Sequence, residues 1–207
     1  PFSIAFNLRG ITRLCEDEIL RPEATARLLL RLAENQAGFC RAIAEAGLDV
    51  AFFESAAAPP LLSPRQFHQI ELPALRRILN LAAECLGHPV PCIMGGNTYP
   101  ILADLLATGT TYLACNVETD QKRFVESVAR THPHVRVRVN LDPGVVASSE
   151  LERIHAGVDR VLEIIGDRSN CLIGTGALPF ETPPGNVRLI RECLARRASD
   201  QSQPSTL

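Results

Sequence analysis

Short apolar runs alternate with longer amphipathic stretches along the chain. Six of these runs are too short to be helices, and most lack the strict polar–apolar alternation of a half-buried strand. Continuous apolar runs of this length are typical of strands buried on both faces of a parallel sheet. The exception is 135–139, where Val alternates with Arg136 and Arg138. The predicted strands span residues 1–6, 50–53, 90–94, 112–115, 135–139 and 171–173.

The stretches between the runs carry apolar residues at helical spacing and recognisable helix ends. Pro22 suits a first helical turn, and Gly47 suits the position just after a last turn. Capping-box patterns begin at Ser63 and Ser149, and Pro73 predicts a kink or restart within the helix that follows Ser63. The predicted helices span residues 22–46, 63–87, 149–165 and 182–197.

Six strands that alternate with helices predict an α/β fold with a parallel sheet. Two architectures remain open from the pattern alone, a doubly wound open sheet and a barrel. A closed barrel of this class needs eight strands and about 250 residues, so this chain of 207 residues predicts an incomplete barrel or an open sheet. No linker divides residues 1–197, which we interpret as one domain, and the polar segment 198–207 is expected to be a disordered tail.

The composition excludes several classes of protein. Hydrophobic residues make up 46% of the chain and charged residues 21%, which argues against a disordered chain. The net charge of −2 supplies no basic field for nucleic acid or an anionic membrane surface. Only 5% of residues are aromatic and Trp is absent, which disfavours a stacking platform for single strands. No apolar run reaches the roughly 18 residues of a membrane-spanning helix.

The cysteines indicate a reducing environment. They are odd in number, lie in apolar company and follow no secretory signal, so we expect reduced, buried thiols in a cytoplasmic protein. No two of them form a C-x-x-C pair, which leaves a zinc ribbon or thioredoxin-type site unsupported. The chain begins with Pro1 rather than Met, as expected for a fragment or a processed product. The seven cysteines are Cys15, Cys40, Cys85, Cys92, Cys115, Cys171 and Cys193.

Small and polar residues follow the predicted strands, whereas the strand starts lack them. In parallel α/β folds chemistry gathers at the carboxyl ends of the strands, so this asymmetry predicts a single functional rim. The segments that form it are 54–60, 95–98, 116–120, 140–144 and 174–179.

Each rim segment has two interpretations. Segment 95–97 (Gly-Gly-Asn) either cradles an anion with backbone N–H groups or forms a tight turn. Segment 140–143 (Asn-Leu-Asp-Pro) either binds a ligand or is a structural turn. Glu118 and Asp120 either act as acid, base or metal ligands, or this segment caps the next helix through Thr119 or Asp120.

Other charged residues are less informative. None of the five histidines lies after a predicted strand, so no His is placed for catalysis. Arg136 and Arg138 share one face of their strand, which either points into a barrel cavity or is exposed on an edge strand.

Several rim segments together resemble the uroporphyrinogen decarboxylase superfamily. The similarity extends from about residue 2 to residue 197, in the family's order and spacing. The motifs that carry it are Glu54-Ser55 followed by Leu62-Ser63-Pro64 and Leu72-Pro73, then Asn140-Leu141-Asp142-Pro143, then Gly174-Thr175-Gly176 with Pro179 and Thr182-Pro183-Pro184-Gly185-Asn186-Val187.

The resemblance implies a (β/α)8 barrel of the TIM type, present here as about six β/α units, a partial barrel that corresponds to the family's carboxyl-terminal two thirds. It implies tetrapyrrole decarboxylation without a cofactor. Ser55 falls where the decarboxylases have a substrate-contacting Ser, and Thr175 falls where they have a His between two glycines. That His is lost here, and the Arg-rich segment that grips substrate carboxylates would lie upstream of Pro1.

The family's second branch is the cobalamin-dependent methyltransferases, which activate a thiol on zinc. Their H-x-C pair would fall at Ile93-Met94-Gly95 and their late Cys near Gly176, and neither is present. Cys92 and Cys115 are the thiols that remain near these positions, without an evident third ligand.

The main functional expectation is therefore a uroporphyrinogen decarboxylase-like lyase of porphyrin biosynthesis, diverged or inactive as this fragment. The alternatives are a corrinoid-dependent methyltransferase and a non-catalytic ligand-binding barrel. We expect a tetrapyrrole or corrinoid as the small-molecule ligand, no nucleic acid or membrane partner, no metal, and cobalamin or zinc only for a methyltransferase. The catalytic residues stay unassigned. The expected substrate-binding residues are Ser55, Gly95, Gly96, Asn97, Glu118, Asp120, Asn140 and Thr175.

A partial barrel has two open strand edges, which proteins rarely leave uncovered. We therefore expect pairing between two chains as a homodimer, a poorly ordered N-terminus, or a longer native protein.

Overall fold

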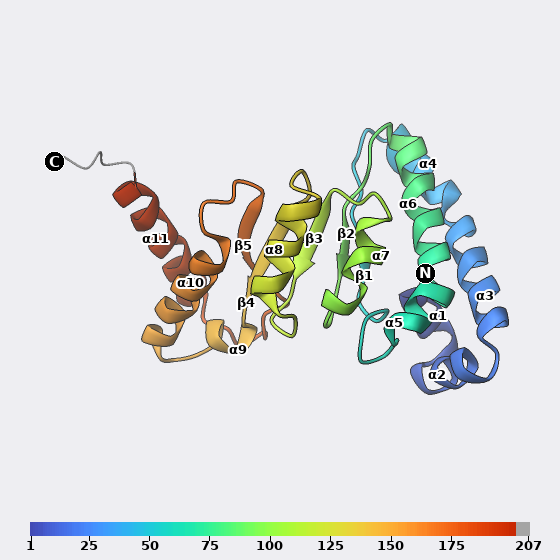
Figure 1. The fold of residues 1–207 in the computed structure, drawn as a ribbon, viewed down its shortest axis with the longest axis horizontal. Helices are drawn as coiled ribbons and strands as arrows, with labels where there is room; N and C mark the ends of the chain where they lie inside the picture. The colour runs from blue at the N-terminus through green and yellow to red at the C-terminus, as the bar shows by residue number, and fades with distance from the viewer. Residues whose placement is uncertain (202–207) are drawn as a thin grey trace.

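The computed structural model describes residues 1–201, with side chains through Arg197. Its strands are short and parallel, and they form two sheets, one of β1 and β2 and one of β3, β4 and β5 in that order. Figure 1 shows the strands side by side across the middle of an elongated molecule, with helices at both ends and in front. The strands are β1 (Phe52–Glu54), β2 (Cys92–Met94), β3 (Tyr112–Cys115), β4 (Arg136–Leu141) and β5 (Cys171–Thr175).

This arrangement confirms the α/β class with parallel strands but not the expected six-unit barrel. The described residues contain five strands and no closed sheet. The missing strand is the first apolar run, 1–6, which is instead helix α1 (Phe2–Arg9). Phe2 and Ala5, three residues apart, are its buried face. A short apolar run does not distinguish a strand from a buried helical turn. Because this segment is a helix with a buried face, the expectation of a poorly ordered N-terminus is also wrong.

Helices form the amino-terminal end of the molecule. After α2 (Ile11–Leu20), the expected helix 22–46 is divided at Gln36 into α3 (Pro22–Asn35) and α4 (Ala37–Glu45). The Gln36 N–H donates to the carbonyl of Ala33 at 3.1 Å, a tightened turn that ends α3. Both helices pack on α6 (Leu72–Leu86).

The capping box at Ser63 is confirmed. The Ser63 hydroxyl accepts the Gln66 N–H, and the Gln66 side chain accepts the Ser63 N–H. The expected irregularity near Pro73 is present as well, because α5 (Pro64–Gln66) continues into a π-helical turn, η1 (Phe67–Glu71), before α6 begins. Gly87 ends α6 in the left-handed conformation with φ 77°, as predicted.

The remaining helices connect the parallel strands and cover them. The second capping box is wrong, because Glu150 rather than Ser149 precedes α10 and no side chain caps it. The last helix begins at Pro184 and runs to Gln201, so it overlaps the start of the expected tail 198–207, whose residues 202–207 lie outside the described part. These elements are η2 (Tyr99–Ile101), α7 (Leu102–Leu106), α8 (Gln121–Thr131), α9 (Pro143–Val146), α10 (Leu151–Ile165) and α11 (Pro184–Gln201).

Side chains join the two sheets where no backbone ladder does. Strands β2 and β3 lie against each other but belong to different sheets. At their amino ends the buried Thr110 hydroxyl accepts the Cys92 N–H at 2.9 Å and lies 3.3 Å from the Val90 carbonyl. Thr110 therefore satisfies the N–H of Cys92, the first residue of β2, which a continuous sheet would satisfy by strand pairing.

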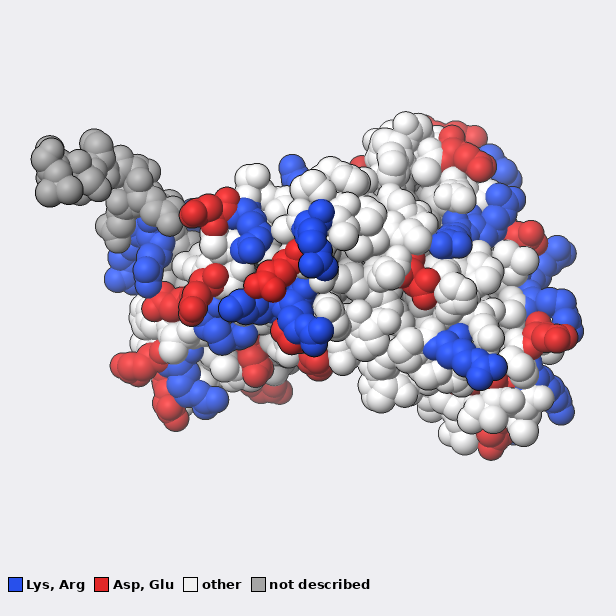
Figure 2. All heavy atoms as spheres, viewed as in Figure 1, with Lys and Arg blue, Asp and Glu red and all other residues white. Residues whose placement is uncertain are grey.

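The surface carries charges of both signs. On the face in Figure 2, Lys and Arg side chains are interspersed with Asp and Glu around α8 and α10. Among the helices of the described residues, none combines the length and apolar character needed to cross a bilayer.

Replacing Thr110 by Val should destabilise the protein by about 1–3 kcal/mol, because the buried Cys92 N–H loses its acceptor. Chemical denaturation followed by circular dichroism measures the change. Thr111→Val, at the half-buried neighbouring position, is the matched control and should be close to neutral. Equal stability of the two variants would show that Thr110 does not join the sheets.

Glu71 is a fully buried carboxyl at the end of η1. Burial raises the pKa of Glu71 well above its usual value, and the nearby Glu54 raises it further. The folded state therefore favours the protonated form of Glu71.

A carboxyl with a raised folded-state pKa contributes stability at low pH and loses it as the pH rises. Wild-type protein should thus lose stability relative to Glu71→Gln as the pH rises from about 4 toward neutrality. Unfolding midpoints measured across this range test the difference. Glu84→Gln, at an exposed position of α6, serves as the control. Parallel pH profiles for wild type and Glu71→Gln would contradict the interpretation.

Candidate functional site

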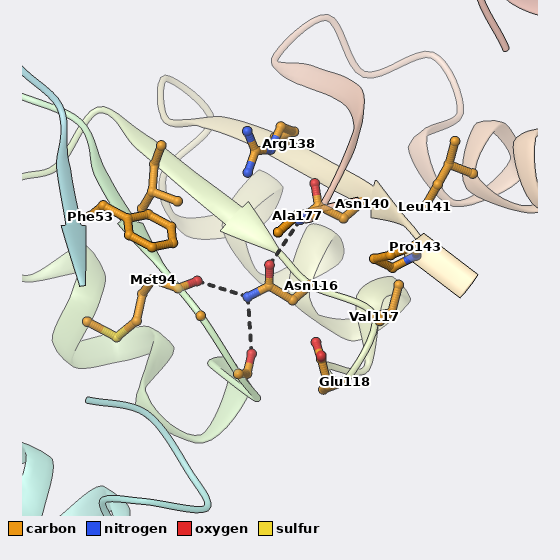
Figure 3. A pocket seen from close by; sticks show the side chains of 14 residues that line it. Phe53, Met94, Asn116, Val117, Glu118, Arg138, Asn140, Leu141, Pro143 and Ala177 are labelled. Carbon is orange, nitrogen blue, oxygen red and sulfur yellow. Dashed lines mark hydrogen bonds between the residues drawn. The ribbon is translucent and has the colours of Figure 1, made fainter. Parts of the chain in front are cut away.

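A cavity of about 290 Å³ lies at the carboxyl ends of the strands, on the rim that the sequence pattern predicts. Figure 3 shows its walls, which come from the end of β1, the loops after β2 and β3, the end of β4 and the loop after β5. Its lining residues are Phe53, Ile93, Met94, Gly95, Gly96, Asn116, Val117, Glu118, Arg138, Asn140, Leu141, Pro143, Gly176 and Ala177.

Asn116 is the centre of a network of amide hydrogen bonds in the floor of this cavity (Figure 3). Its Nδ2 donates to the carbonyls of Met94 at 2.9 Å and Gly96 at 3.2 Å, and its Oδ1 accepts from Nδ2 of Asn140 at 2.9 Å. One side chain thereby joins the ends of β2, β3 and β4, which belong to the two separate sheets.

A second layer of bonds supports the network from behind. The buried Gln121, at the start of α8, donates through Nε2 to the carbonyls of Cys115 at 3.1 Å and Asn140 at 2.8 Å. Arg160 of α10 donates to Gln121 Oε1 at 2.9 Å. These contacts hold the ends of β3 and β4 against the helices that cover them.

The network determines which way the Asn140 amide faces. Asn116 must present Nδ2 to two carbonyls, so its Oδ1 is left as an acceptor and Asn140 must present Nδ2 to it. The oxygen of Asn140 is then left without a hydrogen-bond partner among the described residues, in a side chain only 2% exposed that lines the cavity. A buried acceptor of this kind is costly unless a ligand or water donates to it.

Among the described residues, Arg138, two residues before Asn140, is the only Lys or Arg that lines the cavity. Its aliphatic part lies over Gly174 of β5, where a Cβ atom would come within 2.5 Å of Arg138 Cδ. Its Nε is buried without a partner, and no described carboxylate forms a salt bridge with it. The cavity therefore has one partly buried, unneutralised cation on its β4–β5 side.

Four of the eight predicted substrate-binding residues line the cavity: Gly95, Gly96, Glu118 and Asn140. The turn interpretation of Gly95 and Gly96 is favoured, because the N–H groups of Gly95 and Asn97 bond to the carbonyls of Glu54 and Pro59. The two glycines also permit close backbone contact. A Cβ at Gly96, where φ is 78°, would lie 2.9 Å from the Pro59 carbonyl oxygen.

The other four predicted residues do not line the cavity. Ser55 bonds through its backbone N–H to the Ser3 hydroxyl at 3.1 Å. Asn97 accepts the Tyr99 N–H at 3.4 Å, in the turn that leads into η2. Asp120 caps α8 by accepting the Arg123 N–H at 3.2 Å, and Thr175 faces a separate hollow beside α11. Their binding role stays a prediction, without support from this cavity.

In the Asn-Leu-Asp-Pro segment the structural interpretation applies to Asp142, and the binding interpretation stays a prediction for Asn140. Asp142 is structural, since its carboxylate accepts the Gly144 N–H at 2.7 Å and caps α9. Asn140 faces the cavity.

Asn116 and Arg138 are missing from the predicted site residues. Asn116 is the first residue after β3, so strand-end position alone was a usable signal. Arg138 lies inside β4 rather than at its end, and only its alternation with Val indicated a shared face, without telling whether that face was exposed.

The thiols near the cavity do not fit a zinc site. Burial, the main cause, raises the pKa of Cys92 and the pKa of Cys115 to about 12 each, and neither thiol lines the cavity. Within residues 1–201, no group of three or more His, Cys, Asp or Glu side chains is arranged to hold a metal ion.

Comparison with known proteins gives a consistent picture. The family model described as uroporphyrinogen decarboxylase (URO-D) matches residues 1–197. A uroporphyrinogen decarboxylase of Thermus thermophilus is 30% identical over 176 residues, covering 84% of this chain and 49% of the relative. One from Prochlorococcus marinus is 27% identical over 175 residues, covering 83% and 47%. The chain thus spans about half the length of these curated relatives.

Among solved structures, a methyltransferase from Methanosarcina mazei superposes with a TM-score of 0.76 at 23% identity. The superposition covers 96% of this chain and 57% of the methyltransferase. At this identity the likeness concerns the fold.

Asn116→Leu should destabilise the protein by about 2–3 kcal/mol, because the Asn140 amide and two strand-end carbonyls lose their partner in one step. Urea unfolding measures the loss. Asn97→Leu removes a single long bond in the neighbouring loop and should cost less than half as much. If Asn116→Leu lost no more stability than Asn97→Leu, the amide network would not have the structural role assigned to it.

Proposed function

Because the chain belongs to the uroporphyrinogen decarboxylase family, we propose that its cavity binds a carboxylate-bearing tetrapyrrole as part of a decarboxylase. The whole enzyme of the relatives is about twice as long as the match to this chain, so we assign to this chain one wall of the substrate site. The proposal concerns the class of the ligand and the type of reaction, and residues of the cavity support it.

The observation that carries the proposal is the unpartnered oxygen of Asn140. It is a buried acceptor facing a cavity, and its Nδ2 and backbone carbonyl are held by Asn116 and Gln121. A rigid, desolvated acceptor favours a ligand that brings an N–H group, because the ligand restores the bond that burial removed. The pyrrole N–H groups of a tetrapyrrole are donors of this kind.

Decarboxylation of an acetate side chain breaks one C–C bond, releases carbon dioxide and leaves a carbon that takes up a proton. A proton donor beside the ring is therefore required. Glu118 is the carboxyl group among the cavity-lining residues, on the opposite side of the amide network from Arg138 in the view of Figure 3. We assign it to proton transfer in this proposal, with any further catalytic groups supplied by the rest of the enzyme.

A corrinoid-dependent methyltransferase is the second reading of the same fold. Its thiol activation depends on zinc, and among the described residues no group of donors is arranged to hold that metal. The third candidate is a barrel that binds its ligand without catalysis. It predicts the same ligand binding as the decarboxylase but no enzymatic activity.

The test is a titration of the chain with uroporphyrin, a stable oxidised mimic of the substrate, and separately with a cobalamin, followed by porphyrin fluorescence and absorbance. We expect saturable micromolar binding of uroporphyrin, weakened about ten-fold or more in Asn140→Leu through loss of a buried acceptor. Asn97→Leu should bind like wild type. Thermal unfolding of each variant separates loss of binding from loss of folding.

Each other outcome has a definite meaning. Binding of cobalamin alone would transfer the assignment to the methyltransferase branch. Binding of neither ligand would overturn the proposal for this cavity. Uroporphyrin binding that Asn140→Leu leaves unchanged would place the porphyrin elsewhere on the protein.

A further inference from the structure

We propose that Arg138, lying over Gly174, is the anchor for one acidic side chain of the ligand and thereby sets how the ligand is oriented in the cavity. The inference rests on the proposed function for the identity of that ligand. It adds a specificity-determining residue that is not among the substrate-binding residues expected from the sequence.

The strand register shows in which direction the Arg138 side chain runs. Arg138 is paired with Leu172 of β5, and Asn140 is paired with Gly174. The Arg138 Cγ and Cδ atoms nevertheless lie over Gly174, 2.7 and 2.5 Å from where a Cβ atom would stand. The side chain therefore extends along the strands toward their carboxyl ends, into the wall of the cavity, and any residue larger than Gly at 174 would occupy its path.

The charge of Arg138 has no counterpart in the described part of the chain. Some other arginines are paired with a carboxylate, for example Arg9 with Asp17 at 2.7 Å, and Arg160 has a hydrogen-bond acceptor in Gln121 at 2.9 Å. Arg138 has a buried Nε without a partner beside an open cavity. A guanidinium binds a carboxylate through two parallel N–H groups, so an anionic ligand group satisfies both the charge and the orphaned donor.

Arg138 and Asn140 together specify the ligand more narrowly than either residue alone. They are two residues apart on β4 and so project from the same face, with Cα atoms about 7 Å apart. One presents a cation and the other an acceptor. The matching ligand carries an N–H group and a carboxylate a few ångströms apart, as a five-membered N–H ring with a short acidic side chain does.

Glu118 offers no competing anchor for the acidic side chain. Its carboxyl group lines the cavity away from Arg138 (Figure 3). An acidic side chain turned toward Glu118 meets a carboxyl group, whereas the same side chain turned toward Arg138 meets a charge of opposite sign. Arg138 therefore selects one orientation of the ligand.

The first experiment uses a small probe and does not depend on tetrapyrrole binding. In ¹⁵N-labelled protein, the Arg138 Nε–H resonance is assigned by its absence in Arg138→Gln and followed during titration with indole-3-acetate. This probe combines a ring N–H with a short carboxylate. We expect a saturable shift of that resonance, and none with 3-methylindole, which lacks the carboxylate. An unchanged resonance in indole-3-acetate would overturn the proposal.

The second experiment measures uroporphyrin affinity in a set of matched variants. Arg138→Gln should weaken binding about ten-fold or more, the usual scale of a charged hydrogen bond. Arg136→Gln removes the same charge from the exposed position two residues earlier on β4 and should change affinity less than two-fold. Equal losses in the two variants would show a general charge effect and overturn the anchor.

Gly174→Ala tests the geometry without removing any charge. It should weaken uroporphyrin binding in the wild-type background, because the added methyl group displaces the Arg138 side chain. In the Arg138→Gln background the same change should have little further effect, a coupling that additive structural damage does not produce. Additive losses would overturn the role of Gly174.

The two proposals fail in different ways. If indole-3-acetate shifts the Arg138 resonance but uroporphyrin does not bind, the carboxylate anchor stands and the tetrapyrrole assignment falls. If uroporphyrin binds and Arg138→Gln binds it as well as Arg136→Gln does, the tetrapyrrole assignment stands and the anchor falls.

Discussion

The side chain of Asn116 is the interaction on which the site depends. Strands β2 and β3 share no backbone ladder, so side chains must hold the two sheets in position. Thr110 does this at the amino ends of the strands and Asn116 at the carboxyl ends. Because Asn116 also holds Asn140, the contact that joins the sheets also forms the floor of the cavity.

The polar groups behind the strand ends have hydrogen-bond partners, whereas two polar groups that face the cavity have none in the described part of the chain. Gln121 and Arg160 complete the bonds behind the strand ends, whereas the Asn140 oxygen and the Arg138 Nε lack partners among the described residues. Buried polar groups normally find partners, so the acceptor and the cationic donor left open on one strand support the ligand site proposed for this cavity.

The cavity lies at the rim where the family relationship predicts a site, but not every residue selected by that relationship lines it. The rim positions are those where parallel α/β proteins act on their substrates, and the chain belongs to the decarboxylase family. Ser55 and Thr175, the positions that resemblance selects, lie outside the cavity. The cavity instead uses Asn116, Asn140 and Arg138. The chain spans about half of its relatives' length, so its cavity forms one part of the site proposed for the enzyme.

The amino-acid sequence by itself determined the parallel α/β class, the rim at the strand ends, the Ser63 capping box and the end of α6 at Gly87, because each depends on local periodicity or backbone preference. Tertiary structure decided that residues 2–9 form a helix, since a short apolar run fits either state until its neighbours cover it. It also decided that Asp120 and Asp142 cap helices while Asn140 and Arg138 face a cavity. A side chain's role at a strand end depends on which backbone groups its neighbours leave unpaired, and this is settled only when distant segments meet.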